Sequence, residues 1–170
     1  MPDFRIIAID PSLRGTGYAV LESNGRRHAA LEYGVIRNVA TLRFSSCLVA
    51  IHGRIRELLG KWQPSAMAIE SVIYVQSHRT AIALGAARGS AILAAAQAGL
   101  PIHEYPPKRI KQAVVGVGGA QKDQVAFMVR ALLRLTETPP ADAADALAIG
   151  LTHFQAAETA ARRATPHESI

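Results

Sequence analysis

The chain has 170 residues, of which 49% are hydrophobic and 19% charged, so we expect one folded domain and exclude a disordered chain. Its 19 Lys and Arg against 13 Asp and Glu give a net charge of +6, which favours a polyanionic partner but is weak evidence alone. The apolar runs are too short to span a bilayer and the N-terminus lacks a signal-peptide pattern, so we predict a soluble cytoplasmic protein without a membrane partner. The single cysteine, Cys47, is expected in the core.

The first part of the chain predicts three strands. A short apolar run, residues 4–9, ends at Asp10 and is followed by a turn rich in Pro, Ser and Gly. Residues 18–22 and 29–36 have the composition of two further strands, and the turn SNGRR between them indicates a hairpin. We therefore expect three antiparallel strands at the start of the fold.

Apolar residues at helical spacing next predict an amphipathic helix from Thr41 to Trp62, with Trp62 in the core. A short buried strand, residues 66–69, ends at Glu70. The remaining elements are expected at residues 78–98 (an alanine-rich helix), 101–105 (a strand), 107–115, 121–135 and 141–160 (three helices).

This order of elements is typical of an α/β domain with a mixed sheet and helices on its faces. Strands that follow helical crossovers are expected to lie parallel to their neighbours. We assign residues 1–160 to the domain and residues 161–170 to a flexible C-terminal tail.

Four carboxylates stand at the ends of predicted elements. Asp10 ends the first strand and Glu70 the fourth, while Asp142 and Asp145 open the last helix with a spacing that places both on one face. Sites in α/β proteins gather at the carboxyl ends of strands, and carboxylates from separate elements can bracket two Mg²⁺ ions for phosphodiester hydrolysis. The local alternatives are a turn at Asp10, a solvent-facing Glu70, and helix capping by Asp142 with Asp145 in the first turn.

Ala81, Gly85 and Gly89 form a stripe of small residues on the alanine-rich helix. Glycine costs a helix about 1 kcal/mol, so two on one face indicate that something packs very close there. A second copy of the chain in a homodimer is one candidate, and the protein's own sheet is the other.

Several segments together closely resemble the bacterial RuvC family of Holliday (crossover) junction endodeoxyribonucleases: AIDPSLRGTGYAV, MAIESV, ALGAARGSAILAAA, EYPPKRIKQAVVGVGGAQKDQVAFMVRALL and ADAADALAIGLTH. The resemblance covers residues 6 to about 153. It implies an RNase H-like fold with a five-stranded mixed sheet and a homodimer that makes paired nicks in four-way DNA junctions during homologous recombination and DNA repair. It also implies two Mg²⁺ ions per subunit, with Mn²⁺ as a substitute, and the RuvA–RuvB branch-migration complex as a partner.

The resemblance also assigns roles to individual residues. The metal ligands it implies are Asp10, Glu70, Asp142 and Asp145. It places Lys111 and Lys122 near the scissile phosphate and makes Lys122 catalytic; a cation near a helix N-terminus, as Lys122 is, opposes the helix dipole. Arg14 and Arg88 are further candidates for contacts with DNA phosphates.

The chain departs from the family pattern after Glu70. The family has a phenylalanine three positions later and a Lys-Asn pair shortly after, whereas this chain has IYVQS at residues 73–77. The family's aromatic residue wedges or stacks against junction bases, and either Ile73 or Tyr74 takes that role here. Ser12 replaces a usual glycine. These differences concern sequence preference and junction distortion more than the chemistry.

Two other classes of function compete with a nuclease. IDPSLRGTG also resembles the phosphate loop of an actin-like or sugar-kinase ATP-binding module, but that fold needs a second lobe, which 170 residues do not supply. A junction-binding scaffold without catalysis is the other, and four acids argue against it. Two nearer alternatives, RNase H enzymes and resolvase-like proteins that process ribosomal RNA, differ from a junction nuclease mainly in their substrate.

Overall fold

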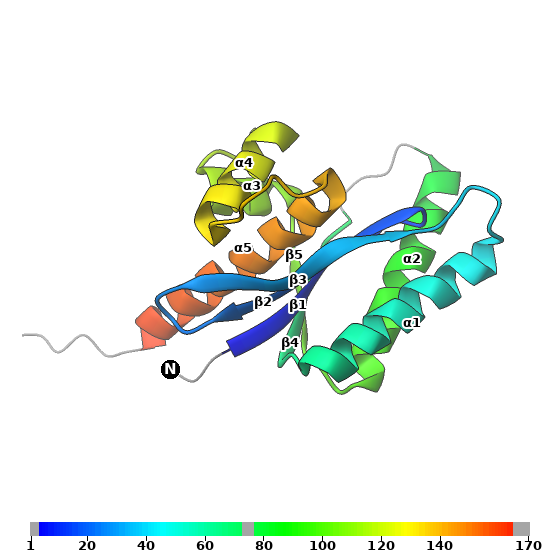
Figure 1. Ribbon diagram of the computed structural model, residues 1–170, viewed down its shortest axis with the longest axis horizontal. Coiled ribbons are helices and arrows are strands. Elements are labelled where there is room, and N and C mark those ends of the chain that lie inside the picture. The colour runs from blue at the N-terminus through cyan, green and yellow to red at the C-terminus, as the bar shows by residue number, and fades with distance from the viewer. Residues whose placement is uncertain (1–3, 73–76, 165–170) are drawn as a thin grey trace, which may run out of the picture.

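The fold is built on one five-stranded sheet, and the computed structural model describes residues 4–72 and 77–164 (Figure 1). The strand order is β3-β2-β1-β4-β5, with antiparallel pairing among β1, β2 and β3 and parallel pairing of β4 with both β1 and β5. The prediction of a mixed sheet with three antiparallel strands first is therefore confirmed. The strands are β1 (Phe4–Asp10), β2 (Gly15–Ser23), β3 (His28–Arg37), β4 (Ala66–Glu70) and β5 (Ile102–Tyr105).

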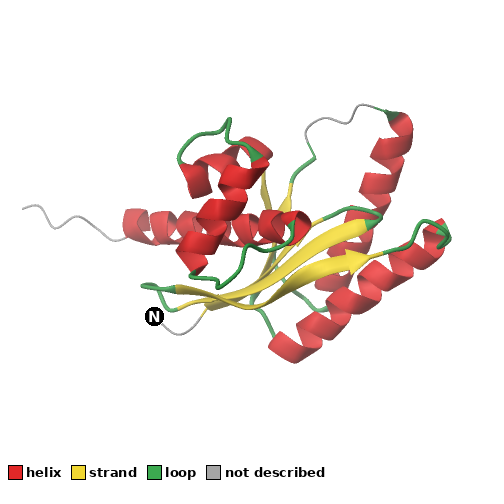
Figure 2. Ribbon diagram, turned by 45° about the horizontal axis from the view of Figure 1, so that its top comes forward, coloured by secondary structure: helices red, strands yellow, loops and turns green. Residues whose placement is uncertain are grey.

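Helices cover both faces of the sheet (Figure 2). One face packs against α1 and α2, and the other against α5, on which α3 and α4 lie as an outer layer. No helix in the described part of the chain is long and apolar enough to cross a bilayer. The helices are α1 (Phe44–Trp62), α2 (His78–Gln97), α3 (Pro107–Val115), α4 (Lys122–Leu133) and α5 (Ala141–Ala164).

Alternation along the two central strands divides their side chains between two cores. Successive strand side chains point to opposite faces, and both faces of β1 and β4 are covered, which explains their nearly continuous apolar runs. The core beneath α5 receives Ile6, Ala8, Ala66 and Ala68, and the core beneath α1 and α2 receives Ile7, Ile9, Met67 and Ile69. By the same alternation, Asp10 and Glu70 face the side of α5.

Two helix boundaries differ from the prediction by three residues or more. The first helix begins at Phe44 rather than Thr41, because Leu42 N–H donates to the Val39 carbonyl in a turn and the Arg14 guanidinium donates to the carbonyls of Val39 and Leu42. These bonds hold the connection after β3 outside the helix. The last helix continues beyond residue 160 to Ala164.

Of the two residues expected in the core, Cys47 is buried as predicted and Trp62 is only partly buried. Cys47 is fully buried. Trp62 is only half-buried, because its indole Nε1 donates to Glu32 Oε2 at 2.8 Å at the edge of the core.

Candidate active site

Two of the four predicted carboxylates end neighbouring strands. Across the parallel pair β1 and β4, Ala8 lies opposite Ala68 and Ile9 opposite Ile69. Asp10 and Glu70 follow at the next position, so the two strands deliver their acidic side chains side by side. Both are half-buried and both face α5.

The other two carboxylates lie in the first turns of α5, over this edge of the sheet. The helix begins at Ala141, and Ala144 N–H already donates to the Pro140 carbonyl. Asp142 therefore lies inside the helix, and the alternative that it serves as the N-cap is wrong. Asp145 follows on the same face and points to the pocket described next.

A pocket of about 300 Å³ gathers acidic and basic side chains from five elements. Lys122 Nζ lies 3.1 Å from Asp145 Oδ2, in an ion pair at the mouth of this pocket. Asp142 is not part of the lining, although its charge acts on Asp10. The lining residues are Asp10, Glu70, Pro107, Ile110, Lys111, Lys122, Val125, Asp145 and Ile149.

Local structure explains how the two lysines reach the pocket. Helix α3 begins with Pro107, whose fixed φ suits a first helical position, and presents Lys111 one turn later. It ends at Val115, and the capping residue Gly116 has a φ of 89°, a conformation that favours glycine. Helix α4 then starts at Lys122, preceded by a capping box in which Gln121 N–H donates to Gln124 Oε1 at 2.8 Å.

Burial of the carboxylates dominates the electrostatics of the pocket, and repulsion among them adds to its effect. Burial raises the pKa of Asp10 to about 8, helped by the negative charges of Glu70, Asp145 and Asp142 and opposed by Lys122. Burial also raises the pKa of Glu70, with Asp145 adding to the effect. The neighbouring Asp145 raises the pKa of Lys122. The site therefore has a surplus of negative charge that a cation would stabilise.

The donor set matches a hard divalent cation such as Mg²⁺, which prefers carboxylate oxygens. Within residues 4–72 and 77–164, no group of three or more His, Cys, Asp or Glu side chains is close enough to form a ready-made metal cage. The support for a metal site is thus the convergence and mutual repulsion of Asp10, Glu70 and Asp145, with Asp142 beside them.

Arg14 and Arg88, two of the weaker DNA-binding candidates, do not line this pocket. Arg14 Nη1 donates to the carbonyl of Val39 at 2.6 Å and of Leu42 at 3.1 Å, so part of its guanidinium braces the connection between β3 and α1. Arg88 lies in α2, on the opposite face of the sheet, and pairs with Glu104 at 2.5 Å. Ile73 and Tyr74 lie outside the described residues. A DNA contact by any of the four stays a prediction.

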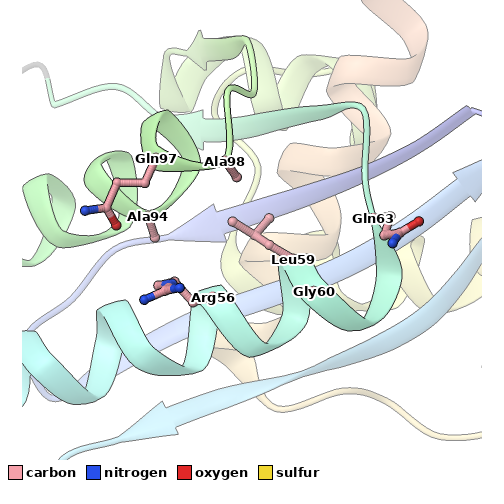
Figure 3. A pocket seen from close by; sticks show the side chains of 7 residues that line it. All are labelled: Arg56, Leu59, Gly60, Gln63, Ala94, Gln97 and Ala98. Atoms are coloured by element: carbon pink, nitrogen blue, oxygen red, sulfur yellow. The ribbon is translucent and has the colours of Figure 1, made fainter.

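A second, larger hollow of about 480 Å³ lies between the C-terminal halves of α1 and α2 (Figure 3). The described residues that line it include one charged side chain, that of Arg56, with Gln63 and Gln97 as its other polar groups. It offers neither a set of metal ligands nor a general base, so we assign the chemistry to the carboxylate pocket.

The sequence prediction missed Gly15 and Gly17, which lie beneath Asp142. A Cβ atom at Gly15 would lie 3.0 Å from Asp142 Oδ2, and one at Gly17 would overlap the Asp142 carbonyl. The signal was present as two glycines at alternate positions of a strand, which mark a close approach by another part of the chain.

The strand order, the helices on both faces and the acids that end β1 and β4 define an RNase H-like α/β protein. A solved structure of Thermus thermophilus RuvC, described as "in complex with Holliday junction substrate", matches with a TM-score of 0.87 and 34% identity over 92% of this chain and 96% of that chain. The family model described as "Crossover junction endodeoxyribonuclease RuvC" matches residues 6–153, and the chain belongs to this family.

Relatives at higher identity carry the same description. The RuvC protein of Akkermansia muciniphila is 58% identical over 91% of this chain and 92% of its own length, and that of Marinobacter nauticus is 45% identical over 94% and 90%. The yeast mitochondrial Holliday junction resolvase Ydc2 matches with a TM-score of 0.63 at 13% identity, a likeness of fold alone.

Proposed function

We propose that this protein is an endodeoxyribonuclease that resolves four-way (Holliday) DNA junctions by paired phosphodiester hydrolysis, in homologous recombination and DNA repair. Membership of the RuvC family and the likeness to a RuvC solved with a junction support the substrate. The observation that carries the proposal is the pocket in which Asp10, Glu70 and Asp145 lie beside Lys111 and Lys122. Carboxylates and lysines together suit a phosphodiester, which needs both an activated water and stabilisation of negative charge.

Two Mg²⁺ ions per subunit, with Mn²⁺ as a substitute, form part of this proposal. When bound, the metal supplies activation of water and stabilisation of the leaving oxygen. The chain contributes carboxylate oxygens from β1, β4 and α5, and the half-buried position of Asp10 and Glu70 strengthens their interaction with a cation. The ligands we assign are Asp10, Glu70, Asp142 and Asp145.

Lys111 and Lys122 are assigned to the scissile phosphate. Lys122 is largely exposed, with 74% of its side chain accessible, and can reach both Asp145 and a bound phosphate. Lys111 also lines the pocket, and its charge opposes the rise in the pKa of Glu70. We assign catalysis to Lys122, because it is the cation that borders the carboxylates directly, and DNA binding to both lysines.

The remaining DNA contacts and partners follow from the family. Ile73 or Tyr74 is proposed as the wedge at the junction centre, and Arg14 and Arg88 as contacts to phosphates. We also propose a cytoplasmic homodimer that acts with the RuvA–RuvB branch-migration complex, since two opposed cuts need two sites.

The test uses four-way, Y-shaped and linear DNA of equal sequence, incubated with the full chain with and without Mg²⁺. We expect paired nicks near the centre of the four-way junction that require the metal. Equal cutting of linear DNA would contradict junction selectivity, and tight junction binding without any cutting would favour a scaffold. Thermal stabilisation by ATP without DNA binding would favour the nucleotide-binding alternative.

The metal assignment predicts the effect of four single changes, made separately. Each is expected to abolish cleavage while junction binding survives, because the change removes a ligand charge and leaves the basic surface intact. Gel-shift binding and cleavage assays on the same junction measure the two effects. Normal turnover in any two of the variants would contradict the assignment. The variants are Asp10→Asn, Glu70→Gln, Asp142→Asn and Asp145→Asn.

A further inference from the structure

Gly17 of β2 is in closer contact with the helix that carries two of the assigned metal ligands than any side chain would allow. A Cβ atom at Gly17 would lie 2.0 Å from the carbonyl oxygen of Asp142 and 2.6 Å from its carbonyl carbon. Both atoms belong to the backbone, so no rotamer change can relieve the overlap. A side chain at this position therefore requires the first turn of α5 to move.

The same glycine is paired with the first carboxylate of the site. In the antiparallel pair of β1 and β2, Gly17 lies directly opposite Asp10, and directly opposed residues share a face of the sheet. The space that a Gly17 side chain would fill is thus the space, next to Asp10, into which the backbone of Asp142 packs. The close approach of α5 to β2 at this point is possible only because Gly17 has no Cβ atom.

Backbone conformation gives no other reason for glycine here. The described glycines with positive φ are Gly25, Gly99 and Gly116, and Gly17 is not among them. Alanine at residue 17 would fit the strand itself, so the consequence of Gly17→Ala is the steric contact with α5 alone.

We infer that Gly17 is a positioning residue for the carboxylate site: it lets the Asp142 backbone rest on β2 and so holds Asp142 and Asp145 opposite Asp10. This inference rests on the proposed metal-dependent nuclease function. Gly17 offers no side chain to DNA or metal, so it acts only through the placement of α5.

Two other glycines provide graded comparisons. A Cβ at Gly150 would lie 2.4 Å from Leu21 Cδ1, again between α5 and β2 but farther along the helix, away from the carboxylates. Gly150→Ala therefore loosens the same packing without touching the site. A Cβ at Gly15 would press on Asp142 Oδ2 at 3.0 Å, and that oxygen can rotate aside, so Gly15→Ala is expected to have a smaller effect than Gly17→Ala.

The experiment compares the full-length parent with Gly17→Ala, Gly15→Ala and Gly150→Ala in three measurements: the rise in Tm on adding Mn²⁺ without DNA, junction binding in EDTA, and cleavage across a Mn²⁺ titration. We expect Gly17→Ala and Gly150→Ala both to lower the metal-free Tm. Gly17→Ala alone should lose the Mn²⁺-induced rise in Tm and lose about a hundredfold in cleavage, as an ångström-scale misplacement does. Its junction binding in EDTA should match that of the parent.

Each outcome decides between the alternatives. A Gly17→Ala protein that responds to Mn²⁺ and cleaves like the parent would overturn the inference, as would an equal loss in Gly150→Ala, which would show general loosening of α5. If Gly17→Ala does not fold, Gly15→Ala takes its place, because it disturbs the packing of the same aspartate on β2 more mildly. This variant should need more Mn²⁺ for half-maximal cleavage at nearly unchanged Tm. Parental behaviour of Gly15→Ala would then overturn the inference. A parent that cleaves no junction would instead overturn the proposed function.

Discussion

Lys122 is at once the first residue of α4 and the ion-pair partner of Asp145. A cation at a helix N-terminus is opposed by the helix dipole, so the position is unfavourable for the helix itself. The carboxylate pocket compensates, because Asp145, Asp10 and Asp142 all favour the charged lysine. A residue whose local and tertiary preferences conflict in this way is characteristic of a functional site.

Lys122→Ala is expected to slow cleavage of a bound junction by about a hundredfold, the usual cost of one lost stabilising group near a reacting oxyanion. The Tm should stay near that of the parent, because the lost ion pair is largely exposed and the opposition to the helix dipole disappears with it. Single-turnover cleavage with saturating protein measures the chemical step. Lys122→Arg, which retains the cation, should recover part of the rate; equal rates for the alanine variant and the parent would contradict a catalytic role.

His153 is a buried titratable group outside the carboxylate pocket. Its Nδ1 lies 2.8 Å from the Tyr105 hydroxyl, its ring stacks on Phe4, and the ring of His103 lies 4.7 Å away between centroids. Burial, with a smaller effect from His103, lowers the pKa of His153 from 6.5 to about 4. The folded protein therefore holds His153 neutral at pH values where the unfolded chain protonates it.

This difference predicts a loss of stability in acid. Between pH 6.5 and about 4 the unfolded chain binds the extra proton, so the contribution of neutral His153 is complete above pH 6.5 and is lost as the pH falls, by up to about 3 kcal/mol. Urea unfolding at several pH values measures it. The raised pKa of Asp10 has the opposite effect on stability, because there the folded protein binds the extra proton. The difference between the curves of the parent and of His153→Gln therefore isolates the contribution of the histidine.

The glutamine variant retains an acceptor for the Tyr105 hydroxyl and does not titrate. It should lose the part of the pH dependence that His153 contributes. Parallel curves for the parent and His153→Gln would contradict the assignment.

Residues that end regular elements are predictable from the sequence, whereas residues defined by contacts between distant segments are not. Asp10 and Glu70 were identified because each stops an apolar run, a signal contained within a few residues. The bond between Tyr105 and His153 joins residues 48 positions apart, and no local pattern indicates it. Arg14 was considered only for DNA, because its carbonyl partners become neighbours only in the fold.

At the scale of elements, the type and order of every strand and helix were predictable, and the boundaries less so. Periodic apolar positions define a helix or strand over its length, whereas its ends depend on capping and tertiary contacts. Thr41 fitted the helical period but lies in the turn fixed by Arg14. The closeness of α5 to β2 was also unpredictable, because Gly17 and Gly150 face each other's elements only after the sheet has formed.

Helix α2 shows a further limit of prediction from sequence, which concerns the face of the helix that is buried. Its buried side consists of Ala87, Ala91, Ala94 and Ala95, while the stripe Ala81, Gly85 and Gly89 is exposed. A Cβ at either glycine would meet no atom within 4 Å, so the alternative that the stripe packs on the protein's own sheet is wrong. The spacing correctly marked one face of the helix, but period alone could not say which face the core takes.

For the whole molecule, the exposed face of α2 bears on the proposed homodimer. Ile82 and Leu93, with 69% and 51% of their surface exposed, extend the glycine stripe into one apolar strip at helical spacing. An exposed apolar strip on a chain with a fully formed core marks an interaction surface. The proposed paired cuts need two active sites, and a two-fold dimer would present two copies of the carboxylate pocket to the junction.

Gly85→Arg is expected to prevent this association, because it places a long charged side chain in the middle of the apolar strip. Sedimentation at micromolar concentration should show a dimer for the parent and a monomer for the variant, and on a plasmid-borne junction the variant should leave single nicks where the parent makes paired ones. Gly60→Arg on α1 is the matched control, since Gly60 is also an exposed helical glycine whose added Cβ would meet nothing within 4 Å. The control should remain dimeric and cut in pairs. A dimeric Gly85→Arg protein that still makes paired nicks would show that the two chains meet elsewhere.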